Sequence, residues 1–251
     1  ALSAMEQGPF SDAFLPLVPG ILKLEYNDFE AIEEIHCRHA AVVVEVVQAE
    51  GGYLPAKPGY LEAIRQRCDD NGCLLIFDEI QTGFGRTGPL FAFQEEAVKP
   101  DILVMAKGMG GGMPLGAIAA RKELMHLFTH QPVLGHITTF GGHPVSCAAS
   151  RAALAFWQSE INPQRAKEIE QLFRAELESV PNSHISGRGA MLALHLNSTE
   201  RMWKAVEQAW KKGLLIDWFL FNEAAFRIAP PLIITDEEIK EACAILRELL
   251  A

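Results

Sequence analysis

The stretch from Leu74 to Gly88 constrains the fold more than any other part of the chain. It begins with an apolar run, Leu-Leu-Ile-Phe, of the kind found in a strand buried on both faces. Two carboxylates follow, Asp78 and Glu79, and then a loop rich in glycine. A charged residue at the carboxyl end of a buried strand lies where open α/β sheets bind their ligands.

A second stretch repeats this pattern with the opposite charge. The apolar run Ile102–Ala106 ends in Lys107, and glycines follow at positions 108, 110, 111 and 112. This loop lacks the spacing of a dinucleotide-binding loop, so we expect its glycines to let the backbone pass close to a bulky cofactor. Two neighbouring strands are therefore expected to bring one acid and one amine to the same edge of a sheet.

Such a pair has a known chemical use. A lysine in an apolar, water-poor pocket has a lowered pKa, so that its neutral amine can attack a carbonyl carbon. A carboxylate can keep the ring nitrogen of a pyridine cofactor protonated, which makes the ring an electron sink. The simpler alternative is that Asp78 and Lys107 are strand-end residues that pair with each other or face water.

The motifs Asp78–Gly88, Lys107 and Thr138–Gly142, in this order, resemble the class III (omega-type) aminotransferases of the ornithine, acetylornithine and 4-aminobutyrate type. The resemblance extends from about Ala40 to Leu250. It implies pyridoxal 5'-phosphate as the cofactor and the α/β fold type I of pyridoxal-phosphate-dependent transferases. A cofactor and reaction of this kind require no metal.

The resemblance also implies roles for individual residues. Lys107 and Asp78 are the expected catalytic residues, and both bind the cofactor. Gln81 is expected to reach the phenolic oxygen of the cofactor, although it also suits a turn-stabilising role. Thr139 is expected to donate to the cofactor phosphate across a dimer interface. The family often has asparagine at the position of His143, and we expect no role for that histidine.

Arg227 and Glu50 are the expected substrate-binding residues. An arginine between Phe226 and Ile228 is poorly placed as a mere solubilising charge, and the family has an arginine there that grips the substrate carboxylate. Glu50 matches a loop glutamate that pairs with this arginine in ornithine-type members, or it is only a solvated loop acid. The loop departs from the family pattern, with Val46 and Ala49 where proline and glycine are usual.

The order of strands and helices predicts two parts. Residues 1–158 are expected to form the C-terminal part of a mostly parallel large-domain sheet, and residues 159–251 a small α+β domain. Strands are predicted over residues 40–47, 73–77, 102–106, 115–120, 185–197, 214–221 and 226–228. Helices are predicted over residues 27–39, 58–71, 90–98, 122–129, 145–158, 165–180, 200–212 and 235–250.

Composition narrows the functional class. The net charge of −10 argues against a nucleic-acid partner, because a basic patch is expected there. No apolar run approaches the length of a membrane span, and the first 20 residues do not resemble a signal peptide. The 5 cysteines are scattered without zinc-site spacing, so free thiols are expected. These features fit a soluble cytoplasmic enzyme. The resemblance to the family implies, in addition, a homodimer with a shared active site.

Two family features are missing from the sequence. Upstream of these motifs, family members carry a turn that grips the cofactor phosphate and an aromatic residue that stacks on the ring. Because neither is found, we expect the chain to be the C-terminal portion of a longer enzyme.

The predicted function is transfer of an amino group from an amino acid to 2-oxoglutarate. Arg227 with Glu50 favours a donor with a distal amine, such as ornithine, acetylornithine, lysine or 4-aminobutyrate. Three alternatives remain open at this stage: an aminomutase of the same fold, a non-catalytic sensor that binds pyridoxal phosphate, and an inactive fragment of the enzyme.

Overall fold

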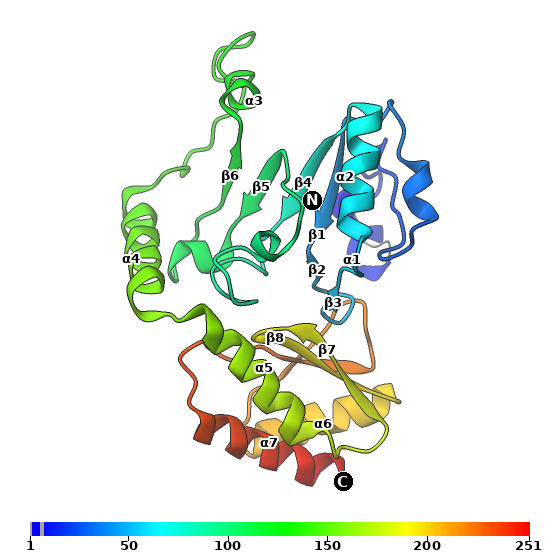
Figure 1. The fold of residues 1–251 in the computed structure, drawn as a ribbon, viewed down its shortest axis with the longest axis vertical. Helices are drawn as coiled ribbons and strands as arrows, with labels where there is room; N and C mark the ends of the chain where they lie inside the picture. Colours follow the sequence, from blue (N-terminus) through cyan, green and yellow to red (C-terminus); the bar gives the residue numbers. More distant parts are fainter. Residues whose placement is uncertain (1, 6–7) are drawn as a thin grey trace.

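Two four-stranded β-sheets, each with its own helices, and one two-stranded hairpin make up the described part of the chain (Figure 1). The computed structural model describes residues 2–5 and 8–251. In the view of Figure 1 the sheet with β1, β4, β5 and β6 lies above the sheet with β7 and β8, and the chain ends below the lower sheet. The prediction of an α/β fold with a parallel sheet is confirmed.

The first sheet has the strand order β1-β4-β5-β6. Its first three strands are parallel, and β6 runs antiparallel to β5, a direction that the sequence did not indicate. The strands are β1 (Ala41–Glu45), β4 (Leu74–Asp78), β5 (Ile102–Met105) and β6 (Ala117–Ala120). The helical segments in this half are η1 (Leu2–Ala4), α1 (Pro9–Asp12), η2 (Ala31–Glu34), α2 (Tyr60–Asn71), η3 (Ala92–Glu95), η4 (Lys107–Gly110), α3 (Lys122–His126) and α4 (Pro144–Glu160).

The pairing of β1 with β4 follows from their apolar sequences, because both strands bury side chains between the sheet and α2. Leu75 and Phe77 of β4 are fully buried, as are Leu61 and Cys68 of α2. The helix ends where Gly72 takes a left-handed conformation, φ 69°, which glycine adopts without steric cost. The helix and both strands confirm the predictions for this region.

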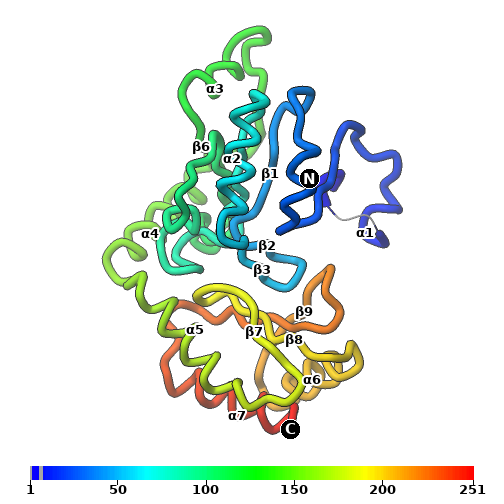
Figure 2. Tube along the Cα trace, turned by 45° about the vertical axis from the view of Figure 1, so that its right-hand side comes forward, coloured from blue at the N-terminus to red at the C-terminus, as the bar shows by residue number. Residues whose placement is uncertain are grey.

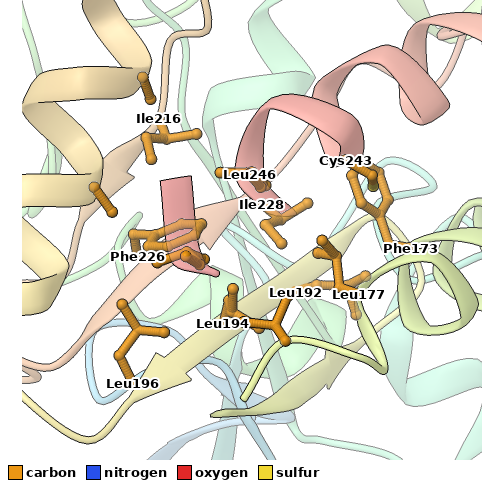
Figure 3. Close-up of a cluster of buried hydrophobic side chains, with 14 of the residues drawn as sticks. Phe173, Leu177, Leu192, Leu194, Leu196, Ile216, Phe226, Ile228, Cys243 and Leu246 are labelled. Carbon is orange, nitrogen blue, oxygen red and sulfur yellow. The ribbon is translucent and has the colours of Figure 1, made fainter. Parts of the chain in front are cut away.

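The second sheet is antiparallel with the order β7-β8-β10-β9. Its strands are β7 (Ser183–Arg188), β8 (Met191–Leu196), β9 (Asp217–Trp218) and β10 (Ala225–Ile228), and its helices are α5 (Pro163–Leu177), α6 (Thr199–Lys211) and α7 (Asp236–Leu250). Figure 3 shows Leu192, Leu194 and Phe226 of the sheet directed toward helix residues such as Leu246. Full burial of such side chains stabilises the fold by about 1.5–3 kcal/mol each. The predicted cap of α7 is confirmed, since Thr235 and Glu238 form a capping box.

Two segments, the helix α4 and a short hairpin, position the two large sheets relative to each other. Helix α4 leads from the first half to α5 along one side of the molecule (Figure 1). A short hairpin, β2 (Val47–Gln48) with β3 (Leu54–Pro55), lies between the sheets and contacts β7 (Figure 2). Residues 49–53, at the tip of this hairpin, therefore face the second sheet.

Two predicted helices differ from the structure. Asp28 accepts hydrogen bonds from the backbone of Glu30 and Ala31 at 2.9 and 3.3 Å, but this turn continues only as the short η2 and not as a helix through His39. The helix expected over 90–98 is likewise only the 3-10 turn η3. The proposed domain boundary at 158/159 remains a prediction; it falls within α4, two residues before the end of that helix. Among the described residues, no helix is long and apolar enough to cross a membrane.

Candidate active site

Asp78 and Lys107 lie at the carboxyl edge of the first sheet, where parallel α/β sheets bind ligands. Asp78 is the last residue of β4 and pairs in register with Val104 of β5. Lys107 follows the end of β5 by two residues and opens the turn η4. Its backbone has a positive φ of 47°, which is uncommon for a residue with a side chain. The structure thus brings the predicted acid and amine to the same edge.

Both side chains keep atoms available for a ligand. Oδ1 of Asp78 accepts a hydrogen bond from the backbone N–H of Ile80 at 2.9 Å, which orients the carboxylate. Within residues 2–5 and 8–251, neither the second oxygen of Asp78 nor Nζ of Lys107 has a hydrogen-bond or ion-pair partner.

The environment of Lys107 differs from the enclosed pocket expected from the sequence, because its side chain is exposed in this chain. Partial burial nevertheless lowers the pKa of Lys107, and the nearby Arg227 lowers it further. The carboxylates of Glu50, Glu45 and Asp78 act in the opposite direction. The net shift increases the fraction of neutral amine at a given pH.

Arg227 and Glu50 form an ion pair between the two sheets. Nη2 of Arg227, on β10, lies 2.5 Å from Oε2 of Glu50 in the hairpin loop. The other carboxylate oxygen of Glu50 accepts from the amide of Gln81 at 3.3 Å. Gln81 therefore contacts Glu50, while its predicted contact with a cofactor oxygen remains a prediction. The hydrogen bonds link the loop after Asp78 to the second sheet.

Two aromatic rings flank the Arg227 guanidinium. Its central carbon lies 4.9 Å from the ring centre of Phe219 and 5.9 Å from that of Tyr53. Nε of Arg227 donates to the backbone carbonyl of Trp218 at 2.8 Å. These contacts orient the guanidinium and add cation–π attraction of about 0.5–2 kcal/mol. The sequence did not single out Tyr53. Phe219 is buried and also contacts the arginine.

Thr139 is not brought to this site within the chain. It belongs to residues 127–145, all of which are exposed. No hydrogen bond joins Thr139 to Asp78, Gln81 or Lys107 in the described part of the chain. The role of Thr139 at the site of a neighbouring subunit remains a prediction.

Arg86 is a further residue that the sequence did not single out. Its guanidinium donates to the carbonyl of Pro230 at 2.5 Å and to that of Ala190 at 3.3 Å, and the N–H of Ala190 donates back to the Arg86 carbonyl at 2.9 Å. Burial lowers the pKa of Arg86. Since Pro230 follows Arg227 by three residues, the loop after Asp78 is tied to the segment that follows β10, the strand of Arg227.

Comparison with known proteins identifies the family. The model of the class III aminotransferases matches residues 1–250 of the chain. The chain belongs to this family. Pyridoxal phosphate is the cofactor of class III aminotransferases, and one crystal structure of the Toxoplasma gondii ornithine aminotransferase has partial occupancy of pyridoxal phosphate at that protein's active site.

Individual relatives agree with this membership. The acetylornithine aminotransferase of Caldanaerobacter subterraneus is 39% identical over the whole chain, which covers 64% of that protein. The crystal structure of the T. gondii ornithine aminotransferase superposes with a TM-score of 0.90 at 34% identity, and the chain covers 61% of it. The acetylornithine aminotransferase of Elizabethkingia anophelis gives a TM-score of 0.83 at 33% identity, over 98% of this chain and 62% of that one. The chain thus spans less than two thirds of the length of these relatives.

The residues present suit pyridoxal phosphate. A carboxylate with one anchored and one free oxygen matches a protonated ring nitrogen, and a free amine with a lowered pKa matches an aldehyde carbon. Asp78 and Lys107 would hold these two parts of the cofactor.

Proposed function

We propose that this aminotransferase moves an amino group from an amino acid with a distal amine to 2-oxoglutarate. The observation that supports the proposal is the arrangement of the two sheets. One sheet presents Asp78 and Lys107 at its edge, and the other presents Arg227, paired with Glu50, toward the same region.

Bound pyridoxal phosphate supplies an electron-withdrawing ring that stabilises negative charge on a substrate carbon. Asp78 holds a proton at the ring nitrogen through its free oxygen. Lys107 removes a proton from the amine-bearing carbon of the substrate and would deliver it to the cofactor carbon that binds the transferred nitrogen, a role that its lowered pKa favours.

Arg227 binds a substrate carboxylate, and Glu50 controls when it does so. While Glu50 is paired with Arg227, the arginine charge is neutralised, and a donor can approach with its distal amine. When Glu50 moves away, Arg227 can hold a carboxylate of 2-oxoglutarate in a two-pronged ion pair. The names of the relatives support this donor class. Ornithine is an amino acid with a distal amine, and acetylornithine is its acetyl derivative.

The proposed assembly is a homodimer with a shared active site. Thr139 lies in an exposed segment, which supports a contact with the cofactor phosphate of a second subunit. The other partners are small molecules, namely the amino acid and the 2-oxo acid.

Donor screening tests the proposal. Purified protein loaded with pyridoxal phosphate is mixed with 2-oxoglutarate and one donor at a time, and glutamate is measured. We expect glutamate with at least one distal-amine donor and none with Lys107→Ala, while Lys99→Ala, an exposed lysine away from the site, retains activity. A cofactor spectrum that does not respond to any donor, with no glutamate formed, would favour the sensor instead.

A further inference from the structure

Three polar side chains, Ser186, His195 and Asn222, form a hydrogen-bonded cluster that holds the hairpin loop carrying Glu50. None of the three belongs to the proposed catalytic or substrate-binding residues. Oγ of Ser186 on β7 donates to the carbonyl of Gly52 at 2.6 Å, and Nε2 of His195 on β8 lies 3.2 Å from the same carbonyl. The amide of Asn222, in the turn before β10, donates to the carbonyl of Gly51 at 3.1 Å. Two side chains of the second sheet and one from the turn before β10 thus bind two consecutive carbonyls of the loop.

The hydrogen-bond partners define the protonation of this cluster. The Asn222 oxygen accepts from the N–H of Ala224 at 3.2 Å, so its NH2 group faces Gly51 and, at 3.4 Å, Nδ1 of His195. Nδ1 is therefore the acceptor, and Nε2 carries the proton toward Ser186 and Gly52. Burial and the neighbouring His184 lower the pKa of His195, which favours this neutral form.

In this proton arrangement His195 does not act as a base toward Ser186, although Oγ of Ser186 lies 2.6 Å from Nε2 of His195. A general base would need an unprotonated Nε2 to accept the serine proton. Here the serine proton is directed to a backbone carbonyl, and the imidazole donates. The hydrogen bonds of the cluster therefore serve to hold the loop carbonyls of Gly51 and Gly52.

The loop has little freedom to move away from the cluster. Gly52 has φ 110°, and a Cβ there would lie 2.7 Å from Cε1 of His195 and 2.8 Å from the Asn222 nitrogen. On the other side, the carbonyl of Glu50 accepts from the N–H of Phe221 at 3.2 Å, and its carboxylate accepts from the N–H of Leu220 at 3.1 Å. Contacts with the second sheet therefore flank the Glu50 carboxylate.

We infer that Ser186, His195 and Asn222 are positioning residues that keep Glu50 against Arg227 and thereby select for donors with a distal amine. This inference rests on the proposed function. If the loop is released, Glu50 pairs less often with Arg227. The exposed positive charge then binds the carboxylate of the donor, and the distal amine is no longer directed to Lys107. The half-reaction with 2-oxoglutarate requires a free Arg227, so the KM for 2-oxoglutarate should not rise.

Single half-reactions of the holoenzyme test this inference. The variants are Ser186→Ala, which removes one donor to Gly52, and His195→Leu, which removes the other. We expect the KM for the distal-amine donor to rise about tenfold, the effect of losing one hydrogen bond of about 1.4 kcal/mol, with less than a twofold change for 2-oxoglutarate. Ser186→Thr retains the hydroxyl and should restore the wild-type ratio of the two KM values.

His184→Leu is the matched control for His195→Leu. The two rings stack 4.4 Å apart, but His184 is exposed and has no hydrogen bond to the loop among the described residues. Because burial, the larger cause, still lowers the pKa of His195 when His184 is replaced, this control should leave both half-reactions unchanged.

An equal loss in both half-reactions of Ser186→Ala, or an unchanged ratio of KM values, would overturn the inference and leave the cluster a purely structural role. If His195→Leu does not fold, Ser186→Ala and Ser186→Thr carry the test. Failure of the proposed function has a different signature, because the wild-type holoenzyme then forms no glutamate with any donor.

Discussion

Glu45 and Asp78 are paired in register at the carboxyl ends of β1 and β4. Two carboxylates on adjacent strands repel each other when both are ionised. Burial, together with the charges of Asp78 and Glu50, raises the pKa of Glu45 to about 7, although the Ala49 N–H donates to its carboxylate at 3.1 Å. Near neutral pH, Glu45 is therefore partly protonated.

Glu45→Gln should stabilise the protein in a pH-dependent manner. Because the pKa of Glu45 is raised on folding, the folded protein binds more protons than the unfolded chain between pH 4.5 and about 7. The wild type therefore loses stability as pH rises through this window, and glutamine avoids the loss. The variant should gain up to about 3 kcal/mol at pH 8 and little at pH 4, measured as the difference in Tm or in urea unfolding. Glu207→Gln, at an exposed position, should show no such pH dependence.

Glu50→Gln should alter the balance between the two half-reactions. Removing the charge weakens the 2.5 Å pair with Arg227, so 2-oxoglutarate should bind more tightly and the distal-amine donor about tenfold less tightly. Stopped-flow measurements of each half-reaction check this prediction. The control is Asp217→Asn, since Asp217 is mostly exposed and lies 3.9 Å from Nε of Arg227, where an ion pair contributes little. An unchanged balance in Glu50→Gln would remove Glu50 from the mechanism.

Arg86→Lys should weaken both stability and substrate binding. A lysine keeps the charge but cannot reproduce the guanidinium contacts with Pro230 and Ala190. We expect a loss of about 1–2 kcal/mol in the free energy of unfolding and a higher KM for carboxylate substrates. Arg151→Lys, at an exposed helix position, should match the wild type in both measurements. Normal KM values in Arg86→Lys would show that Pro230 does not transmit the change to Arg227.

Thr139 and Lys107 allow a test of the shared active site. If Thr139 serves the neighbouring subunit, a hybrid of Lys107→Ala with Thr139→Ala has one site in which both residues are intact. Random mixing of subunits should then give about a quarter of the wild-type activity, although Lys107→Ala alone has none. Tagged hybrids isolated by affinity chromatography should show about half. Activity in the hybrid that does not exceed the average of the two parents would place Thr139 outside the partner's site.

Local sequence was sufficient for the elements of the first sheet. The apolar runs that end at Asp78 and Lys107 could be assigned because each is interrupted by a charge and then by glycine. The helix expected after Asp28 does not form, and the reason is also local. A capping aspartate satisfies the first N–H groups of a turn, but it does not supply the buried face that sustains a longer helix.

The contacts between the sheets could not be predicted from local patterns. Glu50 and Arg227 are separated by 177 residues, and only the resemblance to a family suggested that they meet. Arg86 and His195 were missed because their partners are backbone carbonyls, which leave no mark in the sequence. The sequence offered one signal for Arg86: it is an arginine in a glycine-rich loop that contains no acidic residue.

The bond between Arg86 and Pro230 also bears on attempts to redesign this scaffold for new amines. The carbonyl of Pro230, two residues after the strand of Arg227, accepts from Arg86 in the loop that begins at Asp78, so mutations that shift this segment should also disturb the loop. We therefore expect libraries that vary both segments together to yield more active variants than libraries confined to either one.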